Sequence, residues 1–426
     1  MVQPESPSFF SDREQVSSLA QSFEKVKDVM SRWGIGKIDD RQTVHFCGLI
    51  QHPDLGTLVF LPREAKTNVP HQDMKIGSMT MRALARFATE NSEREFESDG
   101  EAGNLNALSV IARLAEDFAA NGLFSERVRY KTRNSGKPDW VRTIKHELAV
   151  HSNDNQGFYG EVSTTRTNRS SEILLAQIQA AVIREIYSGH GWWLQQAGSR
   201  RHELFSCGRP PIPRRHWSKA LDSMLTTLYS RRSIYVAKYL RHYLMETRAS
   251  SDGSFVFGVE DFHAVWEAML RETIIRSPHD RRRQWNSMLP KPVYLRTNGQ
   301  PSERRARGMQ ADIILENESS YTIVDAKYYA AKNADTAPGW PDIAKQIFYE
   351  KALREVVDTN TELPVPITNI FVFPGKLNHG PLSEVVVQHA DGRAVSSAFP
   401  PVACSYVAIS DALFHYVRRS QGISLV

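Results

Sequence analysis

Hydrophobic and polar positions between residues 311 and 329 fall into two short β-branched runs separated by a polar turn. This pattern predicts a β-hairpin. If Ile313 pairs with Val324, then Asp312 falls opposite Asp325, and directly opposed residues have Cβ atoms about 4.5–5.5 Å apart. We therefore expect two carboxylates to converge at one end of the hairpin.

The second strand of this hairpin adds a lysine to the two acids. Side chains alternate along a strand, so Asp325, Lys327 and Tyr329 share one face. Mg²⁺ binds a few carboxylate oxygens and completes its shell with water and phosphate oxygens. A bound metal ion polarises the phosphate, and a neighbouring lysine can position the attacking water and offset negative charge. The plain alternative is a surface strand on which Asp325 pairs with Lys327.

Two predicted helices flank the hairpin. Residues 261–274 have an apolar stripe at helical spacing, and Glu267 lies beside the centre of that stripe. Residues 341–353 begin at a proline, as many helices do, and carry Gln346 and Tyr349 three residues apart. Glu267 could therefore reach a site beside the predicted sheet.

The remaining pattern divides the chain into three predicted domains. The first, residues 1–125, is an α+β interaction or recognition module. It contains a hairpin at 43–62 and three helices at 15–33, 79–88 and 105–121. A basic, mainly helical middle domain, 126–250, contains helices at 170–187, 217–229 and 234–245. A third domain, 251–426, adds strands at 367–373, 384–388 and 406–410 and a helix at 411–418. Strand–helix alternation of this kind predicts a mixed α/β sheet flanked by helices.

Charge is distributed unevenly along the chain. The formal net charge is +5, but residues 121–310 hold 31 Lys and Arg against 17 Asp and Glu, a balance of +14. The rest of the chain holds 22 against 31, a balance of −9. A basic middle in an otherwise acidic chain predicts a polyanionic partner. Solvated faces of arginine-rich helices would give the same count, and this alternative stays open.

The sequence does not predict a secreted or membrane protein. Its first 15 residues lack the basic and apolar regions of a signal peptide, and no apolar run is long enough to span a bilayer. Cys47, Cys207 and Cys404 are far apart and form no CxxC pattern, so we expect neither a disulfide framework nor a zinc site, and a cytoplasmic location. The phosphate-loop pattern GxxxxGK[ST] is absent, so we expect this chain itself to bind no nucleotide.

The order of the polar residues resembles the nuclease subunits of McrBC-type restriction systems, in the PD-(D/E)xK nuclease superfamily. The likeness consists of a helical glutamate, two aspartates, a lysine in the string DAKYY and a helical glutamine, namely Glu267, Asp312, Asp325, Lys327 and Gln346. The resemblance implies a restriction-endonuclease-like mixed sheet over 251–426. It implies that the three acids bind Mg²⁺, for which Mn²⁺ can substitute, that the lysine activates water and that the glutamine fixes the geometry. Ala311 stands where the family usually has proline.

A second resemblance lies between residues 127 and 144. The residues that match the G-K-x-x-W-x-R-T-I signature of LlaJI-type restriction subunits, relatives of the McrC family, are Gly136, Lys137, Trp140, Arg142, Thr143 and Ile144. A basic turn with one aromatic side chain could contact DNA or pack between domains. Both roles stay open for Lys137, Trp140 and Arg142.

Arginines near the predicted metal site are expected to contact DNA phosphates. They form two clusters that precede Asp312 in the sequence. The first cluster, expected on a loop, is Arg281, Arg282 and Arg283, and the second is Arg304, Arg305 and Arg307. The related families act with a separate AAA+ GTPase, so the resemblance implies a McrB-like partner in addition to double-stranded DNA. A second nuclease copy is a further expected partner, because one site cuts one strand.

The sequence therefore predicts a Mg²⁺-dependent DNA endonuclease subunit of a McrBC/LlaJI-like restriction (anti-phage) system. A first alternative, from another functional class, is a DNA-binding or NTPase-stimulating adaptor that does not cut. A second alternative is an RNA nuclease or repair nuclease with the same core.

Overall fold

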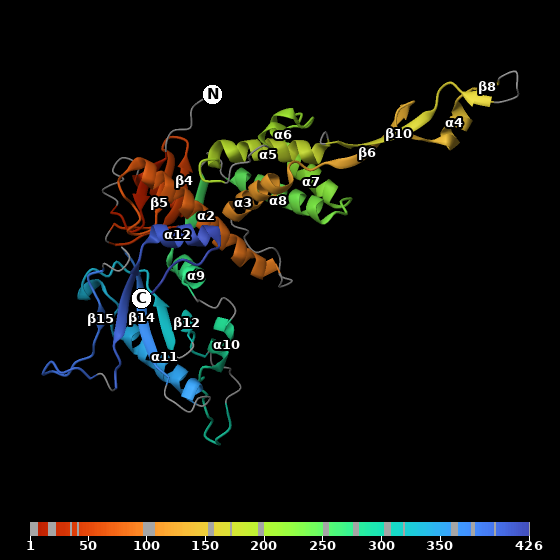
Figure 1. Cartoon of the computed structure of the whole chain (residues 1–426). Coiled ribbons are helices and arrows are strands. Elements are labelled where there is room, and N and C mark those ends of the chain that lie inside the picture. Colours follow the sequence, from red (N-terminus) through yellow and green to blue (C-terminus); the bar gives the residue numbers. More distant parts are fainter. Residues whose placement is uncertain are drawn as a thin grey trace. The chain divides into compact units, whose positions relative to one another are not determined.

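The structure is a computed structural model with the elements shown in Figure 1. It describes residues 7–15, 23–34, 36–40, 42–96, 107–151, 157–170, 173–194, 200–249, 255–275, 281–301, 308–317, 320–358, 365–375, 380–395 and 398–425. Contacts group the chain into two units, residues 1–109 with 250–426, and residues 110–249. The expected domain boundaries after residues 125 and 250 stay predictions, because packing alone does not show which segments fold independently.

The N-terminal sheet combines strands from two distant parts of the sequence. Its strand order is β1-β5-β4-β11. The predicted hairpin is confirmed as the antiparallel pair β4 and β5, β1 joins β5 in parallel, and β11 pairs antiparallel with β4. The bounds of the strands are β1 (Ser8–Ser11), β4 (Cys47–His52), β5 (Gly56–Leu61) and β11 (Phe255–Val259). Residues of the predicted third domain thus complete the sheet of the first.

Helices pack on this sheet. The buried side of α1 (Phe23–Trp33), which includes Val26 and Met30, shares a core with Phe60 of β5. α2 (Pro70–Phe96) contacts β4 and β5 and is much longer than the helix predicted at 79–88. A short antiparallel pair, β2 (Lys37–Ile38) and β3 (Val44–His45), follows α1 in the chain. The observed elements confirm a mixed α and β composition for the N-terminal segment.

The second sheet carries the acid-bearing hairpin. Its order is β12-β13-β14-β16-β15, with β13, β14 and β16 parallel to one another and antiparallel pairs at both edges. The expected mixed sheet is therefore confirmed. Its strands are β12 (Ile313–Glu316), β13 (Tyr321–Ala326), β14 (Ile367–Pro374), β15 (Glu384–Val385) and β16 (Val402–Val407).

Helices pack against this sheet, and one of them, α11, packs against the strand that carries Asp325. Ile314, Ile323 and Leu353 belong to one core, which joins the hairpin to α11. Asp325 shares the strand face of Ile323 because side chains alternate, so the face that packs against α11 is also the face that carries the acid. The helices of this region are α9 (His263–Thr273), α10 (Arg281–Met288), α11 (Trp340–Asp358) and α12 (Ile409–Arg418), with a short turn of 3₁₀ helix, η4 (Ala334–Thr336).

The second unit joins helices to a β-ribbon. The helices are α3 (Ala107–Asn121), α5 (Leu174–His190), α6 (Arg201–Ser206), η3 (Arg214–His216), α7 (Trp217–Leu225) and α8 (Arg231–Ala249). The ribbon consists of β6 (Glu126–Arg133) and β10 (Ser163–Ser170) in antiparallel pairing, with β7 (Lys137–Pro138) added to β10. Between β7 and β10 the chain forms α4 (Trp140–His146) and the pair β8 (Ala149–His151) and β9 (Gly157–Tyr159).

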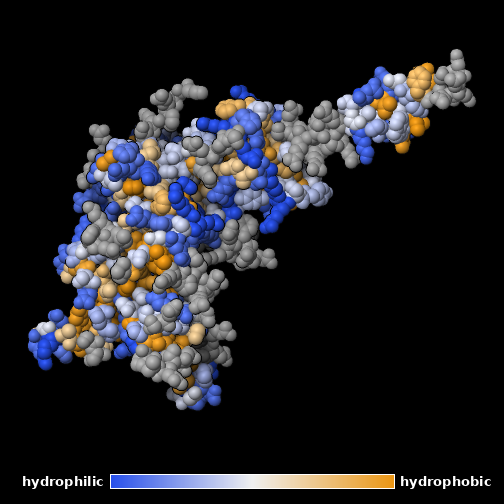
Figure 2. Space-filling model, viewed as in Figure 1, coloured by the Kyte–Doolittle hydropathy of each residue, from blue (hydrophilic) through white to orange (hydrophobic). Residues whose placement is uncertain are grey.

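The end of this ribbon exposes large apolar side chains, which we call the tip surface. Hydrophobic atoms gather over α4 and β8 in Figure 2. The tip surface consists of Trp140, Val141, Ile144, Leu148, Val150 and Phe158, each at least half exposed. A contiguous group of exposed apolar residues is the usual mark of a contact surface.

Several predictions about elements were wrong in detail. The ribbon was not expected in a mainly helical middle domain, because its strands are rich in Arg, Thr and Asn and lack the apolar alternation that identifies a half-buried strand. The helix predicted from residue 170 begins at Leu174, because Ser170 still belongs to β10. Its N-cap Ile173 has an apolar side chain and makes no side-chain hydrogen bond. The strand predicted at 406–410 lies at 402–407. No helix within the described ranges is both long enough and apolar enough to cross a membrane.

Candidate active site

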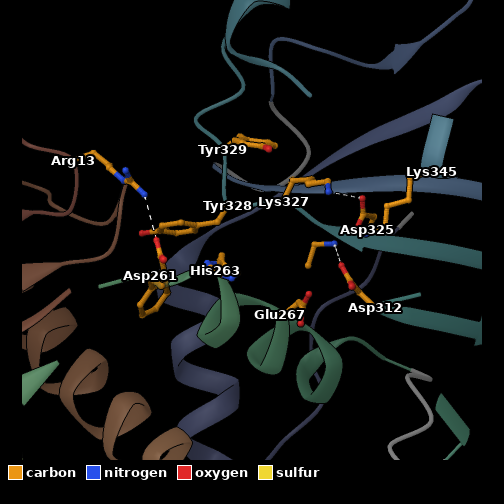
Figure 3. A pocket seen from close by; sticks show the side chains of 12 residues that line it. Arg13, Asp261, His263, Glu267, Asp312, Asp325, Lys327, Tyr328, Tyr329 and Lys345 are labelled. Carbon is orange, nitrogen blue, oxygen red and sulfur yellow. Dashed lines mark hydrogen bonds and ion pairs between the residues drawn. The ribbon is translucent and has the colours of Figure 1, made fainter. Parts of the chain in front are cut away.

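The β12–β13 hairpin brings the two aspartates together. Its register confirms the prediction, since Ile313 pairs with Val324. Asp312 directly precedes β12, and its Oδ2 accepts a hydrogen bond from the backbone N–H of Ala326 at 3.0 Å. Asp325 precedes Ala326 in β13, so the hairpin holds both carboxylates at the same end of the sheet (Figure 3).

Both carboxyl groups are withdrawn from solvent. Asp325 is 1% exposed and Asp312 is 8% exposed. Burial raises the pKa of Asp325 to about 6, and the neighbouring Asp312 carboxyl acts in the same direction, whereas Lys327 opposes the shift. Burial also raises the pKa of Asp312, and the charge of Glu267 adds to that rise. Adjacent buried acids disfavour each other's ionised form unless a cation or a proton compensates them.

Lys327 lies between two carboxylates. Its Nζ is 2.9 Å from Asp325 Oδ2, and it donates a hydrogen bond of 2.7 Å to Asp342 Oδ1. Burial by itself lowers the pKa of this lysine, but the charges of Asp325 and Asp342 outweigh burial and leave the pKa above its ordinary value. The ammonium is therefore a fixed positive charge beside the acid pair.

Glu267 reaches the same site from α9. Its Oε2 forms an ion pair of 3.4 Å with Nη2 of Arg271, one turn further along the helix. Glu267, Asp312, Asp325 and Lys327 together line a pocket of about 300 Å³ (Figure 3). The structure thus brings four of the five predicted catalytic residues to one pocket.

The rest of the lining comes from several other segments, and its polar or aromatic members include Arg13, Asp261, His263, Tyr328, Tyr329 and Lys345. Arg13 belongs to the predicted interaction or recognition module, and its Nη2 lies 3.8 Å from Asp261 Oδ1. The hydroxyl of Tyr328 accepts a hydrogen bond of 2.6 Å from the backbone N–H of Arg63. The segment that follows β5 is therefore joined directly to the residue that follows Lys327.

Gln346 lies outside this lining. Its side chain is buried in α11, at 0% exposure, and among the described residues neither its amide nitrogen nor its amide oxygen has a hydrogen-bond partner. An unpaired buried amide costs about 1–3 kcal/mol. A water molecule or ligand group within reach of this amide would remove that cost.

The side chains of the pocket suit a hard divalent cation. Carboxylate oxygens are the ligands that Mg²⁺ prefers, and Asp312 and Asp325 present them side by side. No three His, Cys, Asp or Glu side chains in the described part of the chain are arranged to hold an ion as they stand, and Glu267 is engaged by Arg271. Asp325 Oδ2 also lacks a hydrogen-bond partner of good geometry within the described residues. The residues therefore fit an ion held by two aspartates, with water and phosphate oxygens in its remaining positions.

The arginines expected to contact DNA are only partly placed. Arg281, Arg282 and Arg283 begin α10, so the expectation that they lie on a loop was wrong. Arginine favours helices, and the helix buries Leu289 at its end beside Ala311. The second cluster, Arg304, Arg305 and Arg307, lies outside the described residues.

The signature residues of the second unit shape the end of the ribbon. Asp139 caps α4 by accepting a hydrogen bond of 3.2 Å from the backbone N–H of Arg142. Lys137 is exposed in β7 and Trp140 is 55% exposed in the tip surface. Gly136 adopts a positive φ of 120° in the turn that leads to β7. Whether these side chains contact DNA or another domain stays a prediction.

Sequence reasoning missed Asp342 and Lys345. Both lie in α11, where Asp342 binds Lys327 and Lys345 Nζ lies 3.9 Å from Asp325 Oδ1. The signal was present in the spacing, because residues three or four apart share a helix face. Gln346 therefore shares its side of α11 with Asp342.

The chain is similar to components of restriction systems. The family model of the LlaJI restriction endonuclease matches residues 46–386, which include all five predicted catalytic residues but not Arg13. A component of the type II restriction enzyme BsuMI, YdjA of Bacillus subtilis (strain 168), is 20% identical over 321 residues. That match covers 71% of this chain and 66% of the relative, just under two thirds of its length. A chain in the cryo-EM structure of the Thermococcus gammatolerans McrBC complex matches 62% of this chain and 86% of its own length, with 12% identity and a TM-score of 0.26.

Proposed function

This chain belongs to the LlaJI restriction endonuclease family, and we propose that it is the Mg²⁺-dependent DNA-cutting subunit of an NTPase-driven restriction system. The observation that supports this proposal is the meeting of Glu267, Asp312, Asp325 and Lys327 in one pocket. Buried, adjacent carboxylates beside a fixed lysine are suited to metal-assisted hydrolysis of a phosphodiester. The proposed fold of this region is the PD-(D/E)xK arrangement.

The residues of the pocket take distinct roles in this proposal. Asp312 and Asp325 hold the metal ion, and Glu267 joins them when it leaves Arg271. The bound ion would polarise the phosphate and lower the pKa of a bound water. Lys327, fixed by Asp325 and Asp342, orients the attacking water and offsets the charge that develops on the phosphate. Gln346 fixes the geometry by pairing its buried amide when the site is filled.

We further propose that a separate AAA+ GTPase drives this nuclease. The tip surface supports a protein partner, because large exposed apolar side chains such as Trp140 and Leu148 are suited to burial in a complex. The basic composition of residues 121–310 supports DNA as the second partner. In the alternative adaptor function, the chain would use the same surfaces without cutting.

The test of the proposed function is a cleavage assay with the full-length chain. We expect double-stranded DNA to be cut only with Mg²⁺ or Mn²⁺, strongly when an AAA+ partner and GTP are present, and weakly or not at all by the chain alone. Chelation of the metal should abolish cutting. An adaptor would stimulate GTP hydrolysis by the partner and leave DNA intact under every metal condition. Cleavage of RNA in preference to DNA would favour the RNA nuclease alternative.

Replacing Arg281, Arg282 and Arg283 by glutamine should weaken DNA binding without changing sequence preference. Phosphate contacts carry little sequence information, and each lost contact should reduce the slope of log K against log salt by about 0.9. Fluorescence anisotropy with labelled duplexes over a range of salt concentrations measures this slope. An unchanged slope would place this end of α10 away from the DNA.

A further inference from the structure

One face of α11 contacts Lys327, Asp325 and the segment just before Asp312. Asp342 accepts a hydrogen bond from Lys327, and Lys345 Nζ lies 3.9 Å from Asp325 Oδ1. One turn further, the hydroxyl of Tyr349 donates a hydrogen bond of 2.5 Å to the backbone carbonyl oxygen of Gln310, two residues before the first aspartate. These positions are three to four residues apart, which is the spacing of one helix face.

The two lysines at Asp325 have different surroundings. Lys327 faces Oδ2, has a second carboxylate at 2.7 Å, and its side chain is 13% exposed. Lys345 faces Oδ1 at 3.9 Å, which is too far for a hydrogen bond, and its side chain is 43% exposed. Its Nζ also lies 5.3 Å from the centre of the Tyr349 ring. Lys327 is therefore committed to protein carboxylates, whereas Lys345 can turn toward a ligand in the pocket.

We propose that Lys345 binds the phosphate of the DNA strand that is to be cut, and is thus a further catalytic residue. This inference rests on the proposed nuclease function. A phosphodiester beside Asp312 and Asp325 would lie in the pocket that Lys345 also lines (Figure 3). An ammonium offers three hydrogen-bond donors, and the charge on the non-bridging phosphate oxygens must be balanced during hydrolysis. Lys345 supplies that charge from α11, opposite the acids of the hairpin.

The competing explanation is an ordinary ion pair between Lys345 and Asp325. Partly exposed pairs of this kind contribute little to stability, so their loss has little effect on folding. A lysine that contacts the reacting phosphate has a much larger effect on the rate, because removal of one preorganised donor typically costs about 10²–10³ in kcat. The two explanations therefore differ in the rate of cleavage and not in stability.

The test compares Lys345→Gln and Lys345→Arg with Lys351→Gln as a matched control. Lys351 is an exposed lysine of the same helix, outside the pocket lining. At saturating DNA and Mg²⁺ in the full complex, we expect Lys345→Gln to lower the cleavage rate about 10²–10³-fold. Lys345→Arg keeps the positive charge and should recover most of this loss. Lys351→Gln should match the wild type, and all variants should keep the wild-type thermal midpoint.

A cleavage rate for Lys345→Gln within about threefold of wild type, which corresponds to less than 1 kcal/mol, would overturn the inference. If the wild-type chain binds DNA and never cuts it, the proposed function fails, and the role of Lys345 is then tested by DNA binding without metal. In that case the slope of log K against log salt should fall by about 0.9 in Lys345→Gln and stay unchanged in Lys351→Gln if Lys345 contacts a phosphate. An unchanged slope in Lys345→Gln overturns the phosphate contact. A wild-type chain that neither binds nor cuts DNA overturns both proposals.

Discussion

Replacing Asp325 by alanine is expected to abolish DNA cleavage while the chain stays folded. Asp325 is the most central acid of the site, since it faces Lys327 and Lys345 and lies beside Asp312. Loss of a metal ligand removes several kcal/mol of transition-state stabilisation, which corresponds to a rate at least about a thousandfold lower. The measurement is plasmid cleavage with Mg²⁺ in the presence of the proposed partner and GTP.

Two further variants show whether the effect belongs to the carboxylate. Asp325→Asn keeps the size of the buried side chain and should be as inactive as the alanine variant, because an amide is a poorer ligand and carries no charge. Asp335→Ala removes an exposed acid of η4 outside the pocket lining and should cut normally. Wild-type cleavage by Asp325→Ala would show that the metal site was assigned to the wrong residues.

Replacing Lys327 by alanine should lower the cleavage rate about 10²–10³-fold but should leave metal binding intact. The ammonium acts on water and on developing charge and is not itself a metal ligand, so the acids that bind the ion remain. Removal of the cation between Asp325 and Asp342 increases the negative charge at the site, which favours binding of a divalent ion. Calorimetric titration with Mn²⁺ measures this binding.

The stability of the Lys327 variant needs its own control. Deleting one member of a buried ion pair can cost about 3–5 kcal/mol, so Lys327→Met, which keeps the apolar stem, should be compared by thermal unfolding. A folded Lys327→Met chain that binds Mn²⁺ and does not cut would separate the lysine's role from its packing. Loss of Mn²⁺ binding in a folded variant would contradict the division of roles between the lysine and the acids.

The acid-bearing hairpin could be predicted from sequence because its signals are local. The apolar runs, the polar turn and the alternation of side chains fix which residues pair, and the observed pairing of Ile313 with Val324 confirms that register. The positions of Glu267 and Lys327 at the site could also be predicted, because each depends only on the residue spacing within one helix or one strand. For such residues, a helix or strand period is enough to decide which side chains share a face.

Other parts of the site could not be predicted because they depend on contacts between distant segments. The pairing of Lys327 with Asp342 requires the first turn of α11 to lie beside the end of β13, and helical spacing alone does not show which face of a helix meets the sheet. Arg13 and Arg63 reach the neighbourhood of the site through the N-terminal sheet. The ribbon of the second unit has polar strands, which lack the periodic signal of a strand with one buried face.

Because β11 pairs with β4, the N-terminal sheet cannot be completed early in synthesis on the ribosome. β4 ends at His52 and its partner β11 ends at Val259, so roughly 200 residues must be synthesised between them. At about 5–20 residues per second, the edge of β4 stays unpaired for about 10–40 s after it emerges. An open strand edge invites pairing with another nascent chain. The N-terminal sheet is therefore completed only when the polypeptide that leads into the pocket has begun to emerge, and a chain interrupted before residue 255 would display that edge permanently.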